Sequence, residues 1–254
     1  MGKGDIVLET LGRKVKLHVD RFGLKVVPAL LYSNLYVIKF LVRIVCLFAP
    51  DVVRTSPADI TIARKLIYQG ANVIEIGSNK GALTKWIARQ VGDKGVVIAI
   101  EPNPVSFQFL LYVTRGFKNV VCVNCGLDER AGNALLYVPR GPTDQSATMV
   151  KNASNAQIKF NSVIMTLDNL VKLLNVAPDI IVIDCEGCEL KAMRGGAFTL
   201  QSFRPKLFIE IHPDLVDKID EQLISFLSNF GYCIINEDRQ NNLLVFESKG
   251  RHKT

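Results

Sequence analysis

Three carboxylates stand within one short run of the chain, Asp184-Cys185-Glu186-Gly187-Cys188-Glu189. The run follows the apolar stretch 180–183, so we expect it where a buried strand ends, a place where charged groups are costly unless they have partners. Asp184 and Glu186 are therefore candidates for orienting or deprotonating an acceptor group. In the alternative interpretation, Glu186 and Glu189 only cap the positive end of a helix expected at 189–194.

A histidine closes the next apolar stretch, in Ile209-Glu210-Ile211-His212-Pro213. If the strand expected at 206–211 adjoins the one at 180–184, the His212 imidazole lies near Asp184 and could take the proton of a hydroxyl acceptor. The alternative is a histidine that caps the following turn. Asp184 and Glu210 could instead share a Mg²⁺ ion, although the sequence shows no clear third ligand.

A glycine turn follows the apolar stretch 72–76 and precedes a helix expected at 82–91, with the sequence Glu75-Ile76-Gly77-Ser78-Asn79-Lys80-Gly81. Glycines let the backbone approach a ligand, and the helix N-terminus offers free N–H groups. The spacing differs from the G-x-G-x-x-G of dinucleotide sites, and Glu75 would repel a pyrophosphate while suiting the cationic amino group of a methionine moiety. The turn therefore predicts an S-adenosylmethionine site that includes Glu75, Gly77, Ser78 and Gly81.

Two further strand ends complete this predicted cofactor site. Glu101 follows the stretch 96–100, 24 residues after Gly77, and its two oxygens could accept both hydroxyls of a ribose. The alternative for Glu101 is a solvated loop acid. The residues from Asn124 and Cys125 to Leu127 follow the stretch 119–123, whose carboxyl end should lie beside the same cleft, so they are candidates for a wall against the adenine ring.

The elements that must position these residues alternate between strands and helices. Strands are expected at 72–76, 96–100, 119–123, 180–184 and 206–211, and their nearly continuous apolar character indicates a parallel sheet covered by helices on both faces. The last two expected strands, 232–236 and 243–247, are joined by a short polar turn and must pair antiparallel. An insertion at 126–170 carries two more strands and a polar loop, which commonly shape a substrate pocket. This is the pattern of the class I methyltransferases and differs from that of the ordinary dinucleotide-binding dehydrogenases.

Five segments carry a closer resemblance, in the order VIEIGSNKG, IAIEPNPVSFQFL, TLDNL, IVIDCEGCELKAMRGG and KLFIEIHP. Over about residues 70–215 the chain resembles the FkbM-type methyltransferases. The resemblance implies methylation of hydroxyl groups on glycans, polyketides or other small molecules, with S-adenosylmethionine as the methyl donor. It also implies that Glu75, Gly77, Gly81 and Glu101 hold the cofactor, and that Asp184 and Glu186 face the transferred methyl group.

The resemblance also implies the fold class. It is α/β, a class I methyltransferase sheet of the Rossmann-like, doubly wound type, with strand order 3-2-1-4-5-7-6, the last strand antiparallel, and an N-terminal helical extension. We expect the extension at 1–60, the methyltransferase domain at 61–248 and a basic tail at 249–254. In this order two strands separate Cys122-x-x-Cys125 from Cys185-x-x-Cys188, roughly 14 Å at normal strand spacing, so the four thiols cannot share one zinc ion.

Residues 30–49 form the most hydrophobic stretch and predict a helix between Pro28 and Pro50. Lys39 and Arg43 near its middle argue against a membrane span. The helix either packs on the domain or over its cofactor cleft, or lies at a membrane interface. No signal peptide opens the chain, so the expected location is the cytoplasm, with peripheral membrane contact through residues 30–49 left open.

The formal net charge of +7 is concentrated at the two ends of the chain, with +4 in residues 1–60 and +3 in residues 249–254. The neutral remainder, which also lacks an amide and aromatic motif after the fourth strand, predicts no nucleic-acid partner. The predicted function is S-adenosylmethionine-dependent O-methylation of a glycan, a lipid-linked sugar or a small molecule. The alternatives are a nicotinamide-dependent oxidoreductase and a non-catalytic membrane-surface binding protein on a vestigial nucleotide fold.

Overall fold

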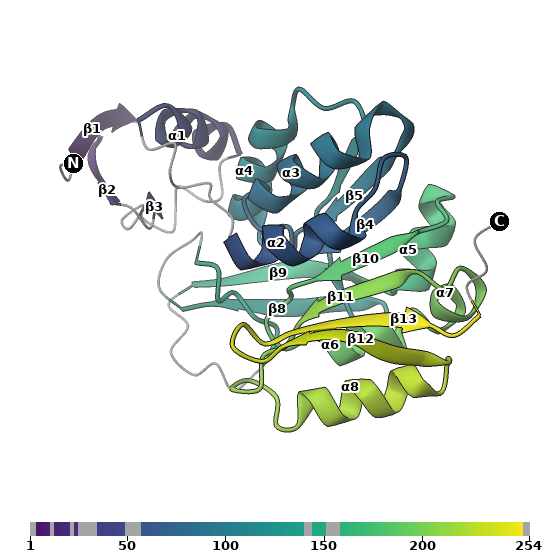
Figure 1. The fold of residues 1–254 in the computed structure, drawn as a ribbon. Coiled ribbons are helices and arrows are strands. Elements are labelled where there is room, and N and C mark those ends of the chain that lie inside the picture. Colours follow the sequence, from purple (N-terminus) through teal and green to yellow (C-terminus); the bar gives the residue numbers. More distant parts are fainter. Residues whose placement is uncertain are drawn as a thin grey trace.

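The central element of the protein is a seven-stranded sheet (Figure 1), seen in a computed structural model that describes residues 4–10, 13–20, 23–24, 35–48, 57–139, 144–150 and 158–250. Its strands run in the spatial order β12-β13-β11-β10-β4-β5-β6. Their bounds are β4 (Asn72–Ile76), β5 (Val96–Ile100), β6 (Val120–Val123), β10 (Ile180–Ile183), β11 (Lys206–Glu210), β12 (Tyr232–Asp238) and β13 (Leu243–Ser248). Neighbouring strands are parallel except that β13 pairs antiparallel with both β11 and β12. The predicted strand order and fold class are therefore confirmed.

Alternation along each central strand explains why both faces of the sheet are apolar. Ile74, Ile98 and Ile181 face one hydrophobic core, and their neighbours Val73, Val97 and Val182 face a second one. Because side chains alternate between the two faces of a strand, an unbroken apolar run exposes apolar side chains on both faces of the sheet, and each face must be buried. Helices pack on both faces.

The two helical layers differ in their members (Figure 1). One core includes buried residues of α5 (Leu167–Leu174), α6 (Glu189–Arg194), α7 (Ala197–Ser202) and α8 (Ile219–Ser228). The other includes residues of α2 (Pro57–Leu66) and α3 (Ala82–Val91), and α4 (Pro104–Thr114) packs beside α3. The helix α4 begins where its sequence dictates, since Pro104 occupies the first turn and the Asn103 side chain accepts hydrogen bonds from the N–H groups of Val105 (3.0 Å) and Ser106 (3.4 Å).

The insertion predicted at 126–170 forms a small second sheet. It contains β7 (Gly126–Leu127), β8 (Gly132–Val138) and β9 (Ile158–Met165), in the spatial order β7-β9-β8. Thr148, in the loop between β8 and β9, forms two backbone hydrogen bonds with Tyr137 and so ties residues 144–150 back to β8. The insertion thereby brings a loop to the carboxyl ends of the central strands.

The N-terminal part holds a three-stranded antiparallel sheet and one helix. The strands are β1 (Gly4–Thr10), β2 (Arg13–Asp20) and β3 (Gly23–Leu24), which we did not predict from the sequence. The helix α1 (Leu35–Phe48) lies within the predicted segment 30–49, of which residues 30–34 and 49 fall outside the described part. It contacts α4 and buries Ile38, Leu41, Val42 and Val45, while Lys39 and Arg43 are exposed. No helix within the described ranges has both the length and the apolar character needed to cross a membrane.

Candidate active site

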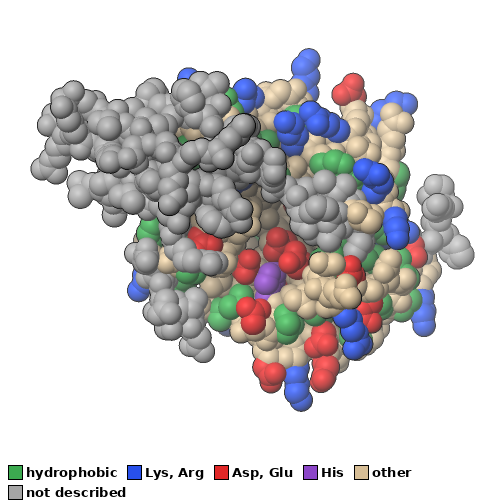
Figure 2. All heavy atoms as spheres, turned by 60° about the vertical axis from the view of Figure 1, so that its left-hand side comes forward, with side chains coloured by type: hydrophobic (Ala, Val, Ile, Leu, Met, Phe, Trp, Pro, Cys, Tyr) green, Lys and Arg blue, Asp and Glu red, His purple; other side chains and the backbone are tan. Residues whose placement is uncertain are grey.

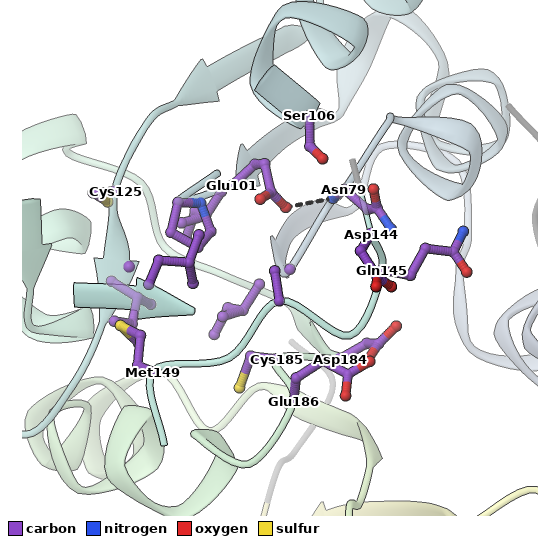
Figure 3. A pocket seen from close by; sticks show the side chains of 18 residues that line it. Asn79, Glu101, Ser106, Cys125, Asp144, Gln145, Met149, Asp184, Cys185 and Glu186 are labelled. Atoms are coloured by element: carbon purple, nitrogen blue, oxygen red, sulfur yellow. Dashed lines mark hydrogen bonds between the residues drawn. The ribbon is translucent and has the colours of Figure 1, made fainter. Parts of the chain in front are cut away.

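A pocket opens at the carboxyl ends of the central strands, where the ends of β4, β5 and β10 are tied together (Figure 3). The N–H groups of Gly77 and Ser78 both donate to the carbonyl oxygen of Ile100, at 3.0 and 2.9 Å, and the N–H of Asp184 donates to the carbonyl oxygen of Ile76 at 2.9 Å. Ligands of open α/β sheets bind at this edge, because the loops leaving the strands diverge there. The described side chains around the pocket come from these loops, from β7 and β8, and from residues 144–149.

Gly77 allows two of these strand ends to touch. Its φ is +87°, and a Cβ atom added to it would lie 1.7 Å from the carbonyl oxygen of Asp184. Any side chain at residue 77 would therefore push the turn after β4 away from the end of β10. The sequence-based interpretation gave Gly77 a ligand contact, and the structure adds this packing role.

Gly81, by contrast, faces the helix α4. A Cβ atom at Gly81 would meet Leu110 of that helix, 2.8 Å from the Cδ1 atom and 3.2 Å from the Cα atom. Gly81 is not among the residues that line the pocket. The absence of a side chain at Gly81 lets the start of α3 approach α4.

The carboxylate of Glu75 is buried and directed toward α3 instead of the pocket. It accepts hydrogen bonds from the hydroxyl groups of Thr84 (2.5 Å) and Ser78 (3.1 Å). Burial raises the pKa of Glu75 to about 7, although these two hydrogen bonds lower it. Neither Glu75 nor Ser78 lines the pocket, so in this geometry both hold the turn that surrounds the cofactor site.

Asn79 is a site residue that the sequence-based reasoning missed. It adopts a left-handed backbone conformation, φ 48°, which asparagine tolerates better than most residues, and its side chain lines the pocket. The Oδ1 atom is buried and has no hydrogen-bond partner among the described residues. A buried acceptor without a donor is costly, so this oxygen suits the ammonium group of a bound methionine moiety.

Glu101 lines the pocket from the end of β5, as expected. Its Oε2 atom accepts from the N–H of Asn79 (2.7 Å) and its Oε1 atom from the N–H of Asn103 (2.8 Å), which orients the carboxylate (Figure 3). Burial raises the pKa of Glu101 to about 7, and the two N–H groups partly offset this effect. Each carboxylate oxygen retains a further lone pair, so the group can still accept hydrogen bonds from a ribose diol.

An apolar wall lines another side of the pocket. Cys125, Gly126 and Leu127 follow β6 and begin β7, and Leu136 of β8 lines the same space. Asn124, predicted beside Cys125, does not line the pocket and instead donates to the carbonyl oxygens of Glu101 (2.7 Å) and Pro102 (3.3 Å). The lining of the pocket thus includes Cys125 and leaves out Asn124, and its apolar character suits an adenine ring.

The acidic run after β10 lies against His212. The Nδ1 atom of His212 is 2.7 Å from Oε1 of Glu189, and its Nε2 atom is 3.6 Å from a carboxylate oxygen of Asp184 and from one of Glu186. Figure 2 shows a histidine side chain among carboxylates on this face. Asp184 and Glu186 also line the pocket, where Figure 3 shows them close together. The structure thus brings the three predicted catalytic side chains to one place.

The charges within this cluster determine the pKa values of His212 and Glu186. Burial alone would lower the pKa of His212, but the hydrogen bond with Glu189 and the charges of Glu186, Glu189 and Asp184 outweigh burial and raise it to about 9. Burial raises the pKa of Glu186 to about 7; His212 opposes this, while Glu210, Glu189 and Asp214 add to it. At neutral pH the imidazole therefore carries a proton, and its positive charge is stabilised by several carboxylates at once.

Glu189, for which helix capping was the alternative interpretation, bonds to His212. Its side chain is completely buried, and its Oε1 atom accepts from the N–H of Gly187 at 2.9 Å as well as bonding to His212. Thr148 donates to the carbonyl oxygen of Glu186 at 2.6 Å and thereby ties the insertion loop to the same run. The expected pairing of β10 with β11 did place His212 near Asp184, but the bond to Glu189 was missed, because it depends on where the start of α6 directs the Glu189 side chain.

Together these features fit S-adenosylmethionine. The acceptor oxygen of Asn79 suits an ammonium group, Glu101 suits a ribose diol, and the wall from Cys125 to Leu127 suits an adenine ring. Asp184 and Glu186 lie at another part of the same pocket, where an acceptor can approach.

Comparison with known proteins gives one family and several distant structures. A family model for the methyltransferase FkbM domain matches residues 75–234, and none of the curated proteins matches. Methyltransferase FkbM from Methylobacillus flagellatus KT is similar in structure, with a TM-score of 0.54 and 16% identity over 77% of this chain and 48% of that chain. Our chain thus spans about half the length of that protein.

Two fibrillarin structures are also similar in fold. Fibrillarin in a complex with Nop5p has a TM-score of 0.50 and 13% identity over 96% of this chain and 97% of that one. Fibrillarin from Aeropyrum pernix, solved with natively bound S-adenosyl-L-methionine, has a TM-score of 0.45 and 12% identity, covering 96% and 81%. At such identities the likeness concerns the fold alone. Because the matched family model includes the turn after β4, Glu101 and the acidic run after β10, the chain belongs to the FkbM family of S-adenosylmethionine-dependent methyltransferases.

Proposed function

We propose that the protein transfers a methyl group from S-adenosylmethionine to a hydroxyl group of a glycan, a lipid-linked sugar or another small molecule. The observation that carries this proposal is the position of Asp184 and Glu186 in the cofactor pocket, next to His212. A hydroxyl group is a poor nucleophile until its proton is drawn away, so a carboxylate within reach of the acceptor is the group that O-methylation needs.

Bound S-adenosylmethionine supplies a methyl group on a positively charged sulfur. The protein's own side chains bind the donor and orient the acceptor, because an in-line displacement depends mainly on alignment and on the exclusion of water. Asn79 would accept from the ammonium group and Glu101 from the ribose hydroxyls. Cys125 and Leu136 would enclose the adenine ring in apolar surface.

Within the acidic cluster, we assign to Asp184 the role of the base that takes the proton of the acceptor hydroxyl. Its side chain is about half exposed (49%) and lines the pocket, so an acceptor can reach it. His212 carries its own proton at neutral pH and cannot take another; in this assignment it is a positioning residue that stabilises the negative charges of Asp184 and Glu186. A role of His212 as the base, the alternative predicted from the sequence, would require its proton to leave first.

The test is the exchange of Asp184 for asparagine, which keeps the shape and removes the charge. We expect the affinity for S-adenosylmethionine to survive while turnover falls by roughly 10²-fold or more, the usual contribution of a positioned base. His212→Gln is the matched variant, and the larger loss identifies the base. Near-normal turnover in both variants would contradict the proposal.

The acceptor itself is best identified in the cell. Untargeted mass spectrometry of a strain lacking the protein should reveal a species lighter by one methyl group than its wild-type counterpart. That species, added to the purified protein with S-adenosylmethionine, should then gain one methyl group on oxygen. Methylation on nitrogen or carbon instead would contradict the hydroxyl assignment.

Membrane contact through residues 30–49 is a separate proposal. Its support is the exposed pair Lys39 and Arg43 on α1, which could face anionic headgroups. The apolar residues of the same helix, however, are buried against α4, which favours packing on the domain. The two possibilities differ in a measurable way, because only packing on the domain makes the stability of the free protein depend on the buried residues of α1.

A further inference from the structure

Three side chains at the ends of β10 and β11 meet beside the pocket. Asp184 follows the end of β10, and the register Ile183↔Ile209 places it next to Glu210, with His212 two residues further along the chain. One possible ligand atom from each of Asp184, Glu210 and His212 lies within 4.8 Å of the others. Sequence reasoning found the first two and lacked a third ligand, which the structure supplies.

We propose that Asp184, Glu210 and His212 bind one divalent cation of the Mn²⁺ or Mg²⁺ class at the edge of the cofactor pocket. The donor set of two carboxylates and one imidazole suits such ions, whose remaining coordination positions stay open for water or for an acceptor oxygen. This proposal goes beyond the proposed function, because binding of the cation requires neither a hydroxyl acceptor nor the methyl donor.

The surroundings of His212 provide the first argument. Its Nδ1 atom is engaged by the buried carboxylate of Glu189 at 2.7 Å, and Glu189 is itself held by the N–H of Gly187 at 2.9 Å. A carboxylate behind an imidazole fixes the orientation of the ring and makes the other nitrogen a better ligand, the arrangement found behind most metal-binding histidines. Here that other nitrogen, Nε2, faces the carboxylates of Asp184 and Glu186.

Spacing provides the second argument. The distance of 3.6 Å from Nε2 to Asp184, and likewise to Glu186, is too long for a hydrogen bond. Two ligand atoms bound at right angles to one cation lie about 3.0–3.4 Å apart when each bond is 2.1–2.4 Å long. The Nε2 atom of His212 and the carboxylate of Asp184 are therefore already separated by nearly the distance that a shared cation imposes. Glu210, with a ligand atom within 4.8 Å of both, completes the set after a movement of its side chain.

The charge of the cluster provides the third argument. Four carboxylates, those of Asp184, Glu186, Glu189 and Glu210, surround one imidazole, whose proton can balance at most one negative charge. In addition, the Oε2 atom of Glu189 is buried and has no hydrogen-bond partner among the described residues. Buried carboxylates of this kind need a nearby positive charge. A divalent cation supplies two and displaces the Nε2 proton of His212, so the cluster gains one positive charge on binding it. The cation would also lower the pKa of an acceptor hydroxyl that joined its coordination shell.

Direct binding of Mn²⁺ tests the proposal without turnover. The full-length protein, stripped with chelator and free of cofactor, is titrated with Mn²⁺, and free Mn²⁺ is followed by electron paramagnetic resonance. We expect one ion per chain, and at least a tenfold loss of affinity in Glu210→Gln, Asp184→Asn and His212→Gln. Asp93→Asn is the matched control, since Asp93 is an exposed acid before β5, away from the carboxyl ends of the strands, and should leave Mn²⁺ binding unchanged.

Glu189→Gln tests the positioning role of the buried carboxylate. Glutamine can still accept from Gly187 but loses the charge behind the imidazole, so we expect Mn²⁺ affinity to drop by roughly 10- to 100-fold. Thermal unfolding of each variant shows whether it is folded, and if His212→Gln fails to fold, Glu210→Gln decides the question. Absence of stoichiometric Mn²⁺ binding to the wild type, or undiminished binding to Glu210→Gln, would overturn the inference.

Discussion

Two buried acids near the cofactor pocket, Glu75 and Glu101, have different surroundings and therefore different expected roles. Glu101 lines the pocket and is oriented by two backbone N–H groups, whereas Glu75 bonds to Ser78 and Thr84 inside the turn. Substitution of Glu101 should act on ligand binding, and substitution of Glu75 should act on stability.

Glu101→Ala removes the acceptor that we assign to the ribose hydroxyls. The affinity for S-adenosylmethionine should fall by roughly 1.5–3 kcal/mol, or about 10- to 100-fold, because hydrogen bonds to a charged group are lost. Isothermal titration calorimetry measures this loss. Glu129→Ala, at an exposed acid outside the pocket, is the control and should bind normally. A loss of only a few tenths of a kcal/mol in Glu101→Ala would show that the carboxylate does not contact the ligand.

Glu75→Gln should change how stability depends on pH. The pKa of Glu75 is about 7 in the folded protein, above its ordinary value of 4.5. Between these values the folded chain keeps a proton that the unfolded chain releases, so the free energy of unfolding falls as pH rises. The full effect is at most about 3 kcal/mol. Glutamine carries no charge at any pH, and the variant should therefore be more stable than the wild type at pH 8 and lose that advantage towards pH 4.5.

Urea unfolding at pH 5 and pH 8 provides the comparison. Glu101 also has a raised pKa, to which the charge of Glu75 makes a small contribution after burial, so the difference between the two proteins includes a minor change at Glu101. A stability difference that is the same at both pH values would mean that Glu75 does not retain its proton on folding.

Individual side chains were predictable where they directly follow apolar strands. Asp184 and Glu101 line the pocket because a strand end fixes their positions, and this information is local. Asn79 and the Glu189–His212 pair were missed for a different reason. The role of Asn79 depends on a left-handed backbone conformation, and the Glu189–His212 bond depends on the direction of a side chain at the start of α6. Neither is visible in composition or spacing.

At the scale of elements, the close contact between the turn after β4 and the end of β10 rests on Gly77. Gly77→Ala would place a Cβ atom 1.7 Å from the carbonyl oxygen of Asp184, at a φ of +87° that alanine disfavours. We expect a loss of more than about 3 kcal/mol in the free energy of unfolding, or failure to fold, since two backbones would have to separate. Chemical denaturation measures the effect.

Gly116→Ala is the control for this substitution. Its added Cβ atom would meet nothing within 4 Å, and its φ lies outside the left-handed range. Gly81→Ala should be intermediate, because the nearest atom is the end of a leucine side chain that can move, although its φ is also positive. Equal stability of Gly77→Ala and Gly116→Ala would contradict the close contact.

The central strands and helices were predictable because the spacing of their apolar residues and the length of each segment fit only one kind of element. The predicted strands at 72–76 and 96–100 coincide with β4 and β5, and the helix predicted at 82–91 coincides with α3. The TLDNL segment, used above only as a mark of family resemblance, has a structural reason: Asp168 accepts from the N–H groups of Phe198 (3.0 Å) and Thr199 (2.8 Å) at the start of α7. The N-terminal strands were missed because this part of the chain was judged by its basic residues, although Val15, Leu17 and Val19 of β2 alternate with polar side chains as a strand requires.

For the whole molecule, the open question is how the N-terminal part relates to the methyltransferase domain. The excess positive charge lies in residues 1–60 and 249–254, outside the central sheet. The helix α1 nevertheless approaches the cofactor turn: burial lowers the pKa of Lys80 in that turn, and Asp144 and the Cys46 thiol of α1 act against this shift. We therefore expect α1 to unfold together with the domain.

Leu41→Ala separates the two interpretations of α1. Leu41 is buried (3% exposed) on α1, the helix that packs on α4, so its truncation should lower the free energy of unfolding by roughly 2–5 kcal/mol, the usual cost of a cavity. Lys39→Ala, at an exposed position on the same helix, should leave stability unchanged and serves as the control. If α1 instead served as an interfacial membrane helix, Leu41→Ala would leave the stability of the free protein unchanged and would weaken its sedimentation with anionic vesicles. Denaturation and vesicle sedimentation of the same three proteins therefore decide whether this helix belongs to the domain or to the membrane surface.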